Sequence, residues 1–298
     1  MSAAAHSGVG APASSGAPAT PPGSDFAAMA RLDLGEVVRS RWLLVCLGLY
    51  GALAGIFVLV GLRESGVVGF TGMGRALFSL CHALVLLLPL MALAVTGQVV
   101  NRARDEGALE LFMSQPVRRA SYFGAVSLVR TLALALPLAL VFLLLAALGK
   151  IVFGEAVAWS FFARSAAVSA ALLWAFAALG LATSVHVRQP ARAMTYLILF
   201  WVAGVALLDF GLIGLMLGWE LNPRAVFAIA ALNPVEAARL ALLSAAEPDL
   251  ATLGPVGFYL ANQVGASGLL AWGIAWPLAF GSLVWAFALR RFRRSDLV

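Results

Sequence analysis

The chain has 298 residues, of which 62% are hydrophobic and 11% are charged, and its formal net charge is +6. An ordinary soluble domain has about 45 to 50% apolar and about 25% charged residues, so this composition excludes a purely soluble protein and indicates that lipid is the main solvent. A net positive charge in a soluble protein would suggest nucleic acid binding, but here the positions of the arginines matter more than their number.

Residues 1–25 are rich in Ala, Gly, Pro and Ser. They have too little apolar surface to bury, so we expect a disordered tail, and they lack the basic start and apolar core of a signal peptide. Residues 26–41 are more polar and predict a short amphipathic helix on the membrane surface. The apolar side chains available to lipid in that helix are Met29, Leu32, Leu34, Val37 and Val38.

Six apolar stretches follow, at about 42–62, 77–100, 122–149, 165–185, 193–217 and 268–289. Each can cross a hydrocarbon core of about 30 Å, because about 20 helical residues suffice. Pro89, Pro137 and Pro277 lie inside three of them, where membrane helices tolerate proline and kink. The sequence therefore predicts an all-α polytopic membrane protein with six transmembrane helices in residues 26–298.

Arginines are concentrated on the flanks that six spans would bring to one side of the membrane. These are Arg31, Arg39, Arg41, Arg102, Arg104, Arg118, Arg119, Arg188, Arg192, Arg290, Arg291, Arg293 and Arg294. The opposite flanks hold fewer bases and several acids. Because positive residues near spans are retained in the cytoplasm, we expect both termini there. This explains the basic charge without nucleic acid.

Residues 101–116, between the second and third spans, are charged, then apolar, then closed by Pro116. Gly107 can end the helical extension of the second span, while Leu109, Phe112 and Met113 have the spacing of one short apolar helix face. Proline disfavours helix at the residue before it, so this helix should end at Gln115. We predict a short cytoplasmic helix with an apolar edge that docks on another surface. A plain polar loop is the alternative.

Residues 218–267, on the outer side, are too many for a passive turn. Asn233, Pro234 and Glu236 have the order of an N-cap, a first-turn proline and an acid at the third position, so a helix should follow to about residue 244. Its alanine and leucine faces suit a helix that lies in the membrane interface or dips into it. An interfacial cover over the spans and a substrate gate are both open interpretations.

Two charged residues fall within predicted spans, Asp209 in the fifth and Arg130 in the third. A charge in lipid is costly, so each should face a helix, a partner or a cavity. Their depths differ by roughly 10 Å, which argues against a direct pair. Arg164, near the outer end of the fourth span, is the better partner for Asp209. A structural ion pair and a functional acid both fit Asp209, but one acid alone does not make a proton pathway.

No cofactor or metal site is expected, because His6, His82 and His186 have no ligand spacing. Lys150 is the only lysine, and no Gly-x-x-x-x-Gly precedes it, so the chain has no nucleotide-binding P-loop. We see no converging acids, His cluster or activated serine of an enzyme. If the protein uses ATP, another polypeptide must bind it.

The segment from Arg104 through Leu111, followed by Ser114-Gln115-Pro116-Val117, resembles the coupling region of ABC-2 type transporter permeases, and the resemblance extends over residues 26–298. In that family six spans form half of a dimer, and this segment contacts a separate ATPase subunit. The family usually has threonine where this chain has Ala108. The resemblance implies a cytoplasmic ABC ATPase contacting Arg104, Asp105, Glu106, Gly107, Leu109, Glu110, Phe112 and Met113, and a second, smaller contact at His186, Arg188 and Arg192.

Within that family, the outer residues are similar to those of the permease of the nitrous oxide reductase maturation system. The likeness lies in Asn233, Pro234 and Glu236 and in Pro255, Gly257 and Tyr259. Those permeases sit in the bacterial inner membrane and work with a cytoplasmic ATPase and a periplasmic protein that serves copper-site assembly. The resemblance implies these partners and a second copy of the chain. Gly51-x-x-x-Gly55 and Gly214-x-x-x-Gly218 are candidates for the dimer seam.

Three alternatives stay open. In the maturation system the chain would transmit motion or pass a copper- or sulfur-related cargo, and the lack of metal ligands along the spans favours mechanical transmission. A second transporter hypothesis is an exporter of a drug, lipid or other hydrophobic cargo. A hypothesis from a different class is a membrane anchor or scaffold, which would need no charged coupling helix.

Overall fold

The computed structural model describes residues 24–65, 72–153, 159–207, 231–246, 262 and 264–294. Within these ranges the chain is helical and forms no strand, which confirms the expected all-α class. The helices are α1 (Ser24–Arg39), α2 (Trp42–Ser65), α3 (Gly72–Thr96), α4 (Val99–Asp105), α5 (Ala108–Met113), α6 (Arg119–Phe153), α7 (Trp159–His186), α8 (Pro190–Trp201), the π-helix η1 (Val202–Leu207), α11 (Pro234–Ala246) and α13 (Gly265–Arg294).

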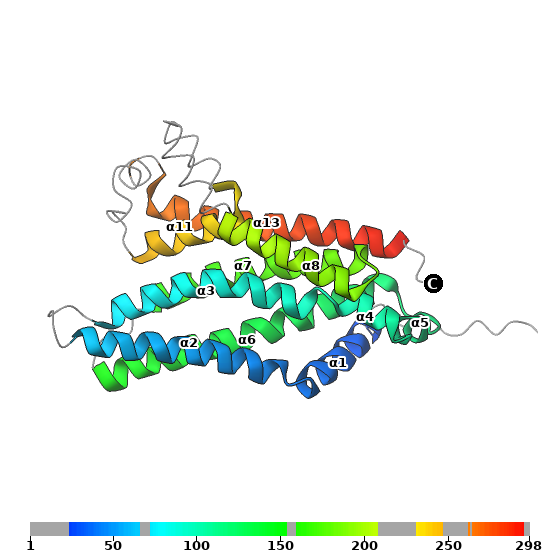
Figure 1. Ribbon diagram of the computed structural model, residues 1–298, viewed down its shortest axis with the longest axis horizontal. Helices are drawn as coiled ribbons and strands as arrows, with labels where there is room; N and C mark the ends of the chain where they lie inside the picture. The colour runs from blue at the N-terminus through cyan, green and yellow to red at the C-terminus, as the bar shows by residue number, and fades with distance from the viewer. Residues whose placement is uncertain are drawn as a thin grey trace, which may run out of the picture.

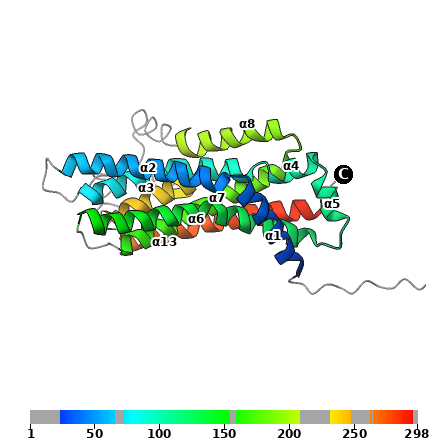
Figure 2. The same cartoon turned by 90° about the horizontal axis from the view of Figure 1, so that it is seen from below.

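The long helices run along one axis and form an elongated bundle (Figures 1 and 2). Four segments of the described chain are long and apolar enough to cross a bilayer, at His82–Asp105, Arg119–Leu148, Trp159–His186 and Gly265–Arg294. α1 and α2 meet at a bend of 58° and make a fifth when taken together. The predicted fifth span begins in α8 and η1 but continues beyond residue 207, outside the described residues. A total of six spans therefore remains a prediction.

α1 confirms a helix in the predicted range, from Ser24 to Arg39 instead of 26–41. The prediction that Met29 and Val37 face lipid is wrong, because both are buried, whereas Leu32, Leu34 and Val38 are exposed as expected. Its buried residues Met29, Asp33 and Val37 recur every four positions and face α6. Arg41 has a positive φ of 57° at the bend into α2. Residues 1–23 of the predicted disordered tail lie outside the described residues.

α7 is the central helix, buried along most of its length and packed against α3, α6, α11 and α13. Glycines lie where α7 approaches α3 and α13 most closely. A side chain at Gly180 would overlap the Thr96 hydroxyl of α3, and a Cβ at Gly281 of α13 would lie 2.8 Å from the Cα of Ala175. Small residues at such crossings let membrane helices pack closely. α7 therefore joins α3 to α13 through contacts that leave little room for independent movement.

α11 is inserted into the bundle and runs antiparallel to α13. Near one end of this pair the Ser244 hydroxyl donates to the Ala266 carbonyl oxygen at 3.4 Å, and near the other the Trp276 indole N–H donates to the Leu232 carbonyl oxygen at 2.8 Å. Trp276 lies about 16 Å along α13 from the first residue of that helix. α11 thus begins deep between α3, α7 and α13, so it dips into the bundle instead of lying over it.

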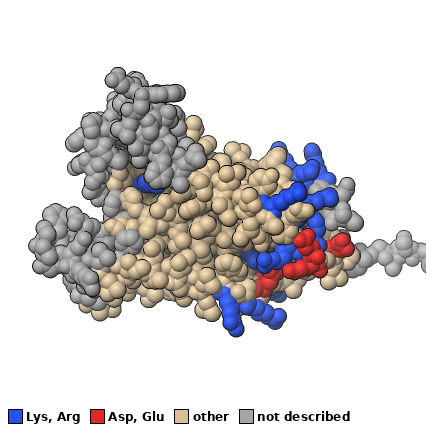
Figure 3. Space-filling model, viewed as in Figure 1, with Lys and Arg blue, Asp and Glu red and all other residues tan. Residues whose placement is uncertain are grey.

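Charged side chains gather at the end of the bundle that carries α4, α5 and the C-terminus, while the middle of the visible face has none (Figure 3). We call this the arginine-rich end. The arginines there lie in α4, at the start of α6, between α7 and α8, in the first turn of α8 and in the last turns of α13. This arrangement suits a bundle whose middle is surrounded by lipid.

Candidate functional site at the arginine-rich end

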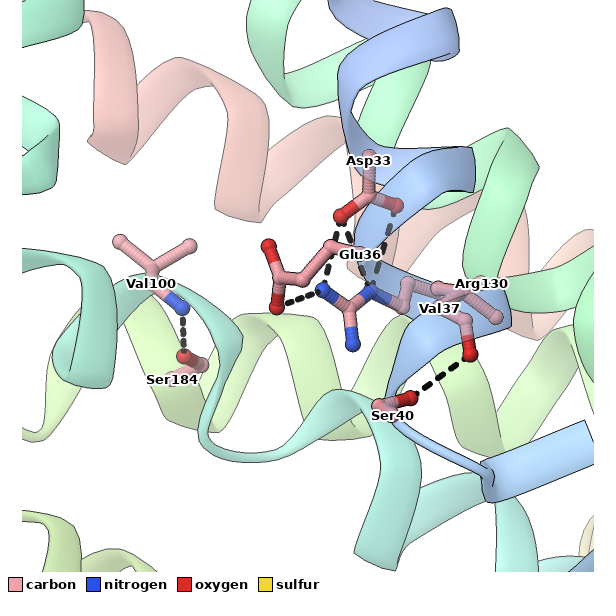
Figure 4. Close-up of polar contacts among 7 residues, drawn as sticks. All are labelled: Asp33, Glu36, Val37, Ser40, Val100, Arg130 and Ser184. Carbon is pink, nitrogen blue, oxygen red and sulfur yellow. Dashed lines mark hydrogen bonds and ion pairs between the residues drawn. The ribbon is translucent and has the colours of Figure 1, made fainter.

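The predicted coupling segment begins where α3 breaks. α3 ends at Thr96, and after Gly97 and Gln98 the chain continues as α4. The Gln98 side chain does not cap α4. Instead the Ser184 hydroxyl of α7 accepts hydrogen bonds from the backbone N–H groups of Val100, at 2.7 Å, and Asn101, at 3.2 Å (Figure 4). A serine from another helix therefore satisfies two first-turn donors of α4, as an N-cap residue ordinarily does.

A tight turn separates α4 from α5. Gly107 has a φ of +72°, a left-handed conformation that favours glycine, and its N–H donates to the Arg104 carbonyl oxygen at 3.1 Å. The prediction that Gly107 ends this helical extension is confirmed. α5 then occupies Ala108–Met113, and Ser114 follows as its C-cap, close to the predicted end at Gln115.

The apolar edge of α5 docks on the chain's own bundle. Leu109 is fully buried in a cluster with Tyr122, Phe123 and Phe292, and Phe112 packs against Tyr122 with ring centroids 5.9 Å apart. The remaining members of this cluster come from α1, α4, α6, α7 and α13, and Met113 packs on its margin. The sequence predicted the apolar edge, and the structure assigns it an intramolecular partner.

The opposite face of α5 is directed outward. Glu106 and Glu110 are exposed, and Leu111, the residue after Glu110, is 63% exposed. An isolated exposed leucine needs no explanation on a soluble protein. On this charged surface segment it supplies an apolar contact next to an acid.

The second predicted contact segment lies beside the first. α7 ends at His186, whose ring stacks on Phe287 of α13 at 5.2 Å. The Asn101 side-chain amide of α4 donates to the Val187 carbonyl oxygen at 3.4 Å. Arg188 and Arg192 are exposed just beyond it. The two segments that the family resemblance singled out, 80 residues apart in sequence, thus form one continuous surface.

Arg104 lies between these segments with an incomplete set of partners. Its Nε and Nη1 atoms are buried, and neither has a hydrogen-bond partner in the described part of the chain. Burial, and then the nearby positive charge of Arg188, lower the pKa of Arg104, while Asp105 opposes the shift. A buried donor without an acceptor is costly, so an acceptor from a bound partner would be favourable here.

Arg130 is held by acids that the sequence did not connect to it. Its guanidinium nitrogens lie 2.7 Å from Asp33 Oδ1 and 2.8 Å from Glu36 Oε1, and the Arg130 and Asp33 side chains are both buried (Figure 4). Both acids belong to α1. Asp33 and Glu36 are three residues apart and share one helix face, and this spacing was the available signal. The network fastens α1 to α6.

The outer segment keeps its predicted N-cap. Asn233 Oδ1 accepts from the Val235 N–H at 3.0 Å, and Asn233 Nδ2 donates to the Gly204 carbonyl oxygen of η1 at 2.7 Å. Pro234 begins α11, and Glu236 pairs with Arg239 at 2.9 Å. Pro255, Gly257 and Tyr259 lie outside the described residues, as does Asp209. Arg164, its predicted partner, is exposed on α7.

The described residues contain no group of three or more His, Cys, Asp or Glu side chains arranged to hold a metal ion. The arginine-rich end offers exposed charges and one exposed apolar side chain, a combination that suits contact with a protein surface.

Comparison with known proteins agrees with this geometry. Residues 27–297 match the family described as ABC-2 family transporter protein. The chain is 28% identical over 271 residues to the "Probable ABC transporter permease protein NosY" of Stutzerimonas stutzeri, covering 89% of this chain and 97% of the relative. It is 30% identical over 274 residues to the protein of the same description from Pseudomonas aeruginosa, covering 90% and 98%. The chain thus belongs to the ABC-2 transporter family and is a multi-pass permease similar to NosY.

Proposed function

We infer that the chain is the transmembrane subunit through which a separate cytoplasmic ABC ATPase drives a conformational change across the bacterial inner membrane. Membership of the family implies an ABC ATPase partner and a membrane setting. The arginine-rich end, with both termini, would face the cytoplasm, because positive flanks are retained there. The observation that carries the proposal is the division of α5 into a buried face and an exposed face.

The exposed face is the surface offered to the ATPase. Leu111 would enter an apolar socket, while Glu106 and Glu110 would meet basic groups of the partner. Arg104 and Arg188 would meet a carboxylate, since Arg104 has buried donors without acceptors. A contact that combines an apolar anchor with opposite charges gives both affinity and register.

The buried face carries the motion into the membrane. Leu109 shares its cluster with residues at the ends of α1, α6, α7 and α13, and such a packed cluster is not continuously deformable. Displacing α5 must therefore move the helix ends with it. Leu109, Phe112 and Met113 belong to the transmission, while Glu106, Glu110 and Leu111 belong to the contact.

The opposite end of the same helices would deliver the motion. α7 and α13 run from the arginine-rich end to α11, which is clamped between them and linked to η1 by Asn233. The resemblance of the outer residues to the permease of the nitrous oxide reductase maturation system supports a role in copper-site maturation. In that role this end would act on a periplasmic copper-assembly protein, in a complex with two copies of the permease. An ABC-2 exporter with a hydrophobic cargo is the second candidate, and it would use the same coupling surface.

The test is ATP hydrolysis by the ATPase that copurifies with the membrane-reconstituted permease. Leu111→Asp and Glu110→Lys should each lower complex formation or ATP turnover at least roughly tenfold, as expected for loss of an interface anchor of about 1.4 kcal/mol or more. Arg290→Ala, at the same end but outside both contact segments, is the matched control and should behave as the unsubstituted protein. Unchanged assembly and turnover in both variants would refute the coupling assignment.

A further inference from the structure

The three acids of α1 all form ion pairs with arginines. Asp25 pairs with Arg118 at 3.4 Å, and Asp33 and Glu36 both pair with Arg130. The buried pair of Asp33 and Arg130 fixes which side of α1 faces the bundle. Each acid is thus paired with a base, although the Glu36 side chain remains 66% exposed.

The outward surface of α1 combines bases with large apolar side chains. Leu32, Leu34 and Val38 are 55%, 50% and 58% exposed, and Arg31 and Arg39 are exposed among them. Neither arginine forms an ion pair with an acid in the described part of the chain. A helix with leucine and valine interspersed with arginine is the pattern of a segment that lies in the interface of an anionic membrane.

An open hollow of about 600 Å³ runs along this side of α1. Its described lining consists of Arg31, Leu32, Gly35, Glu36, Arg39 and Ser40. Gly35 has no neighbouring atom within 4 Å of where a side chain would begin, so the hollow is unobstructed there. Arg31 and Arg39 lie about two turns apart on one side of α1, with Gly35 between them, which suits a negatively charged headgroup.

The outward surface of α1 is continuous with the lipid-facing surface of the bundle. After the 58° bend the chain enters α2, where Leu44 and Val45 are exposed and apolar. A protein partner would have to cover the α1 surface and leave the adjoining α2 surface to lipid. Lipid can cover the surfaces of both helices, so it is the simpler occupant. We propose that the outward face of α1, centred on Arg31 and Arg39, is a binding site for the headgroups of anionic phospholipids.

This site would hold the arginine-rich end at the membrane surface. α1 is fastened to α6 by Arg130, and Met29 of α1 lies in the same buried cluster as Leu109 of the coupling helix. Anionic lipid bound to the outer side of α1 therefore braces the cluster that moves with α5. Lipid binding at this site does not require the ATPase and can be measured without it.

The test uses a fluorophore attached at Val38→Cys in a chain with Cys46→Ser and Cys81→Ser, placed in lipid nanodiscs. Brominated phosphatidylglycerol and brominated phosphatidylcholine are compared as quenchers at equal mole fractions. Phosphatidylglycerol should quench at the lower mole fraction, and its advantage should fall by roughly fivefold for each arginine replaced in Arg31→Gln/Arg39→Gln.

Two control variants distinguish the loss of positive charge on α1 from a loss of structure and from a general loss of charge. Arg31→Lys/Arg39→Lys should keep the preference, and Arg290→Gln/Arg291→Gln, which removes the same charge from the end of α13, should leave it unchanged. Equal quenching by the two lipids would overturn the proposal, as would a preference that survives in the double glutamine variant. Quenching by neither lipid would show that a protein surface covers α1, and would overturn it too.

Discussion

The Ser184 hydroxyl oxygen lies 2.7 Å from the Val100 backbone nitrogen, and this hydrogen bond joins the central helix α7 to the first turn of α4. Both residues are completely buried. Because Asn101 donates to the same oxygen, one hydroxyl positions the start of the coupling segment. The loop that would meet the ATPase is thus held in place by the helix that would carry its motion.

Replacing Ser184 with alanine should therefore destabilise the coupling segment. The change leaves two buried backbone donors without an acceptor, at a cost of about 1–3 kcal/mol. We expect a lower melting temperature of the purified permease and weaker stimulation of ATP hydrolysis. Ser165→Ala is the matched control on the same helix, because the buried Ser165 hydroxyl makes no hydrogen bond in the described structure. Equal losses in the two variants would contradict a capping role for Ser184.

Gly107→Ala should disturb the turn between α4 and α5. Any residue other than glycine is strained at a φ of +72°, by about 1–2 kcal/mol, although a side chain there meets no other atom. We expect reduced coupling of ATP hydrolysis with little loss of expression. Gly48→Ala is the control for non-specific effects, since Gly48 lies within α2 with open space beside it. Full coupling in Gly107→Ala would show that this turn is not needed.

Replacing Arg130 with glutamine should weaken the attachment of α1 to α6. The change leaves the buried Asp33 carboxylate without its arginine, and breaking a buried ion pair from one side costs about 3–5 kcal/mol.

The Arg130→Gln variant should therefore melt at a lower temperature than the unsubstituted protein. Adding Asp33→Asn should recover part of this loss, because the uncompensated buried charge is then absent. A double variant that melts no higher than Arg130→Gln would contradict the role of this pair.

Asn233→Ala should loosen the entry into α11. It removes the cap on Val235 and the link to Gly204, and caps of this kind contribute about 0.5–2 kcal/mol. We expect faster proteolysis at the end opposite the arginines and a lower melting temperature. Asn262→Ala, at an exposed position, supplies the comparison. Indistinguishable proteolysis would mean that the cap does not hold this segment.

Local signals predicted several features well. The helix break at Gly107, the N-cap at Asn233 and a helix within residues 26–41 each depend on a few adjacent residues, and each is confirmed. Which residues of that helix are buried was predicted only in part, since Met29 and Val37 face the bundle. Contacts between distant parts of the chain were not predicted. Asp33 meets Arg130 across 97 positions, and Ser184 caps Val100 across 84, which no spacing rule encodes.

The helix α5 shows the same difference between local features, which the sequence predicts, and long-range contacts, which it does not. Its pattern predicts an apolar edge, but hydrophobic spacing does not say whether that edge packs on the same chain or on a partner. Leu109 is buried by its own bundle, which leaves Leu111, outside the predicted apolar face, as the exposed apolar side chain of α5.

The most direct test of the central claim is cross-linking between α5 and the ATPase. Single cysteines are introduced at Leu111 and at Leu109, in a chain with Cys46→Ser and Cys81→Ser, and the reconstituted complex is treated with a short thiol-to-amine reagent. The account predicts a permease–ATPase product from position 111 and none from position 109. A product from position 109, or from neither, would contradict it.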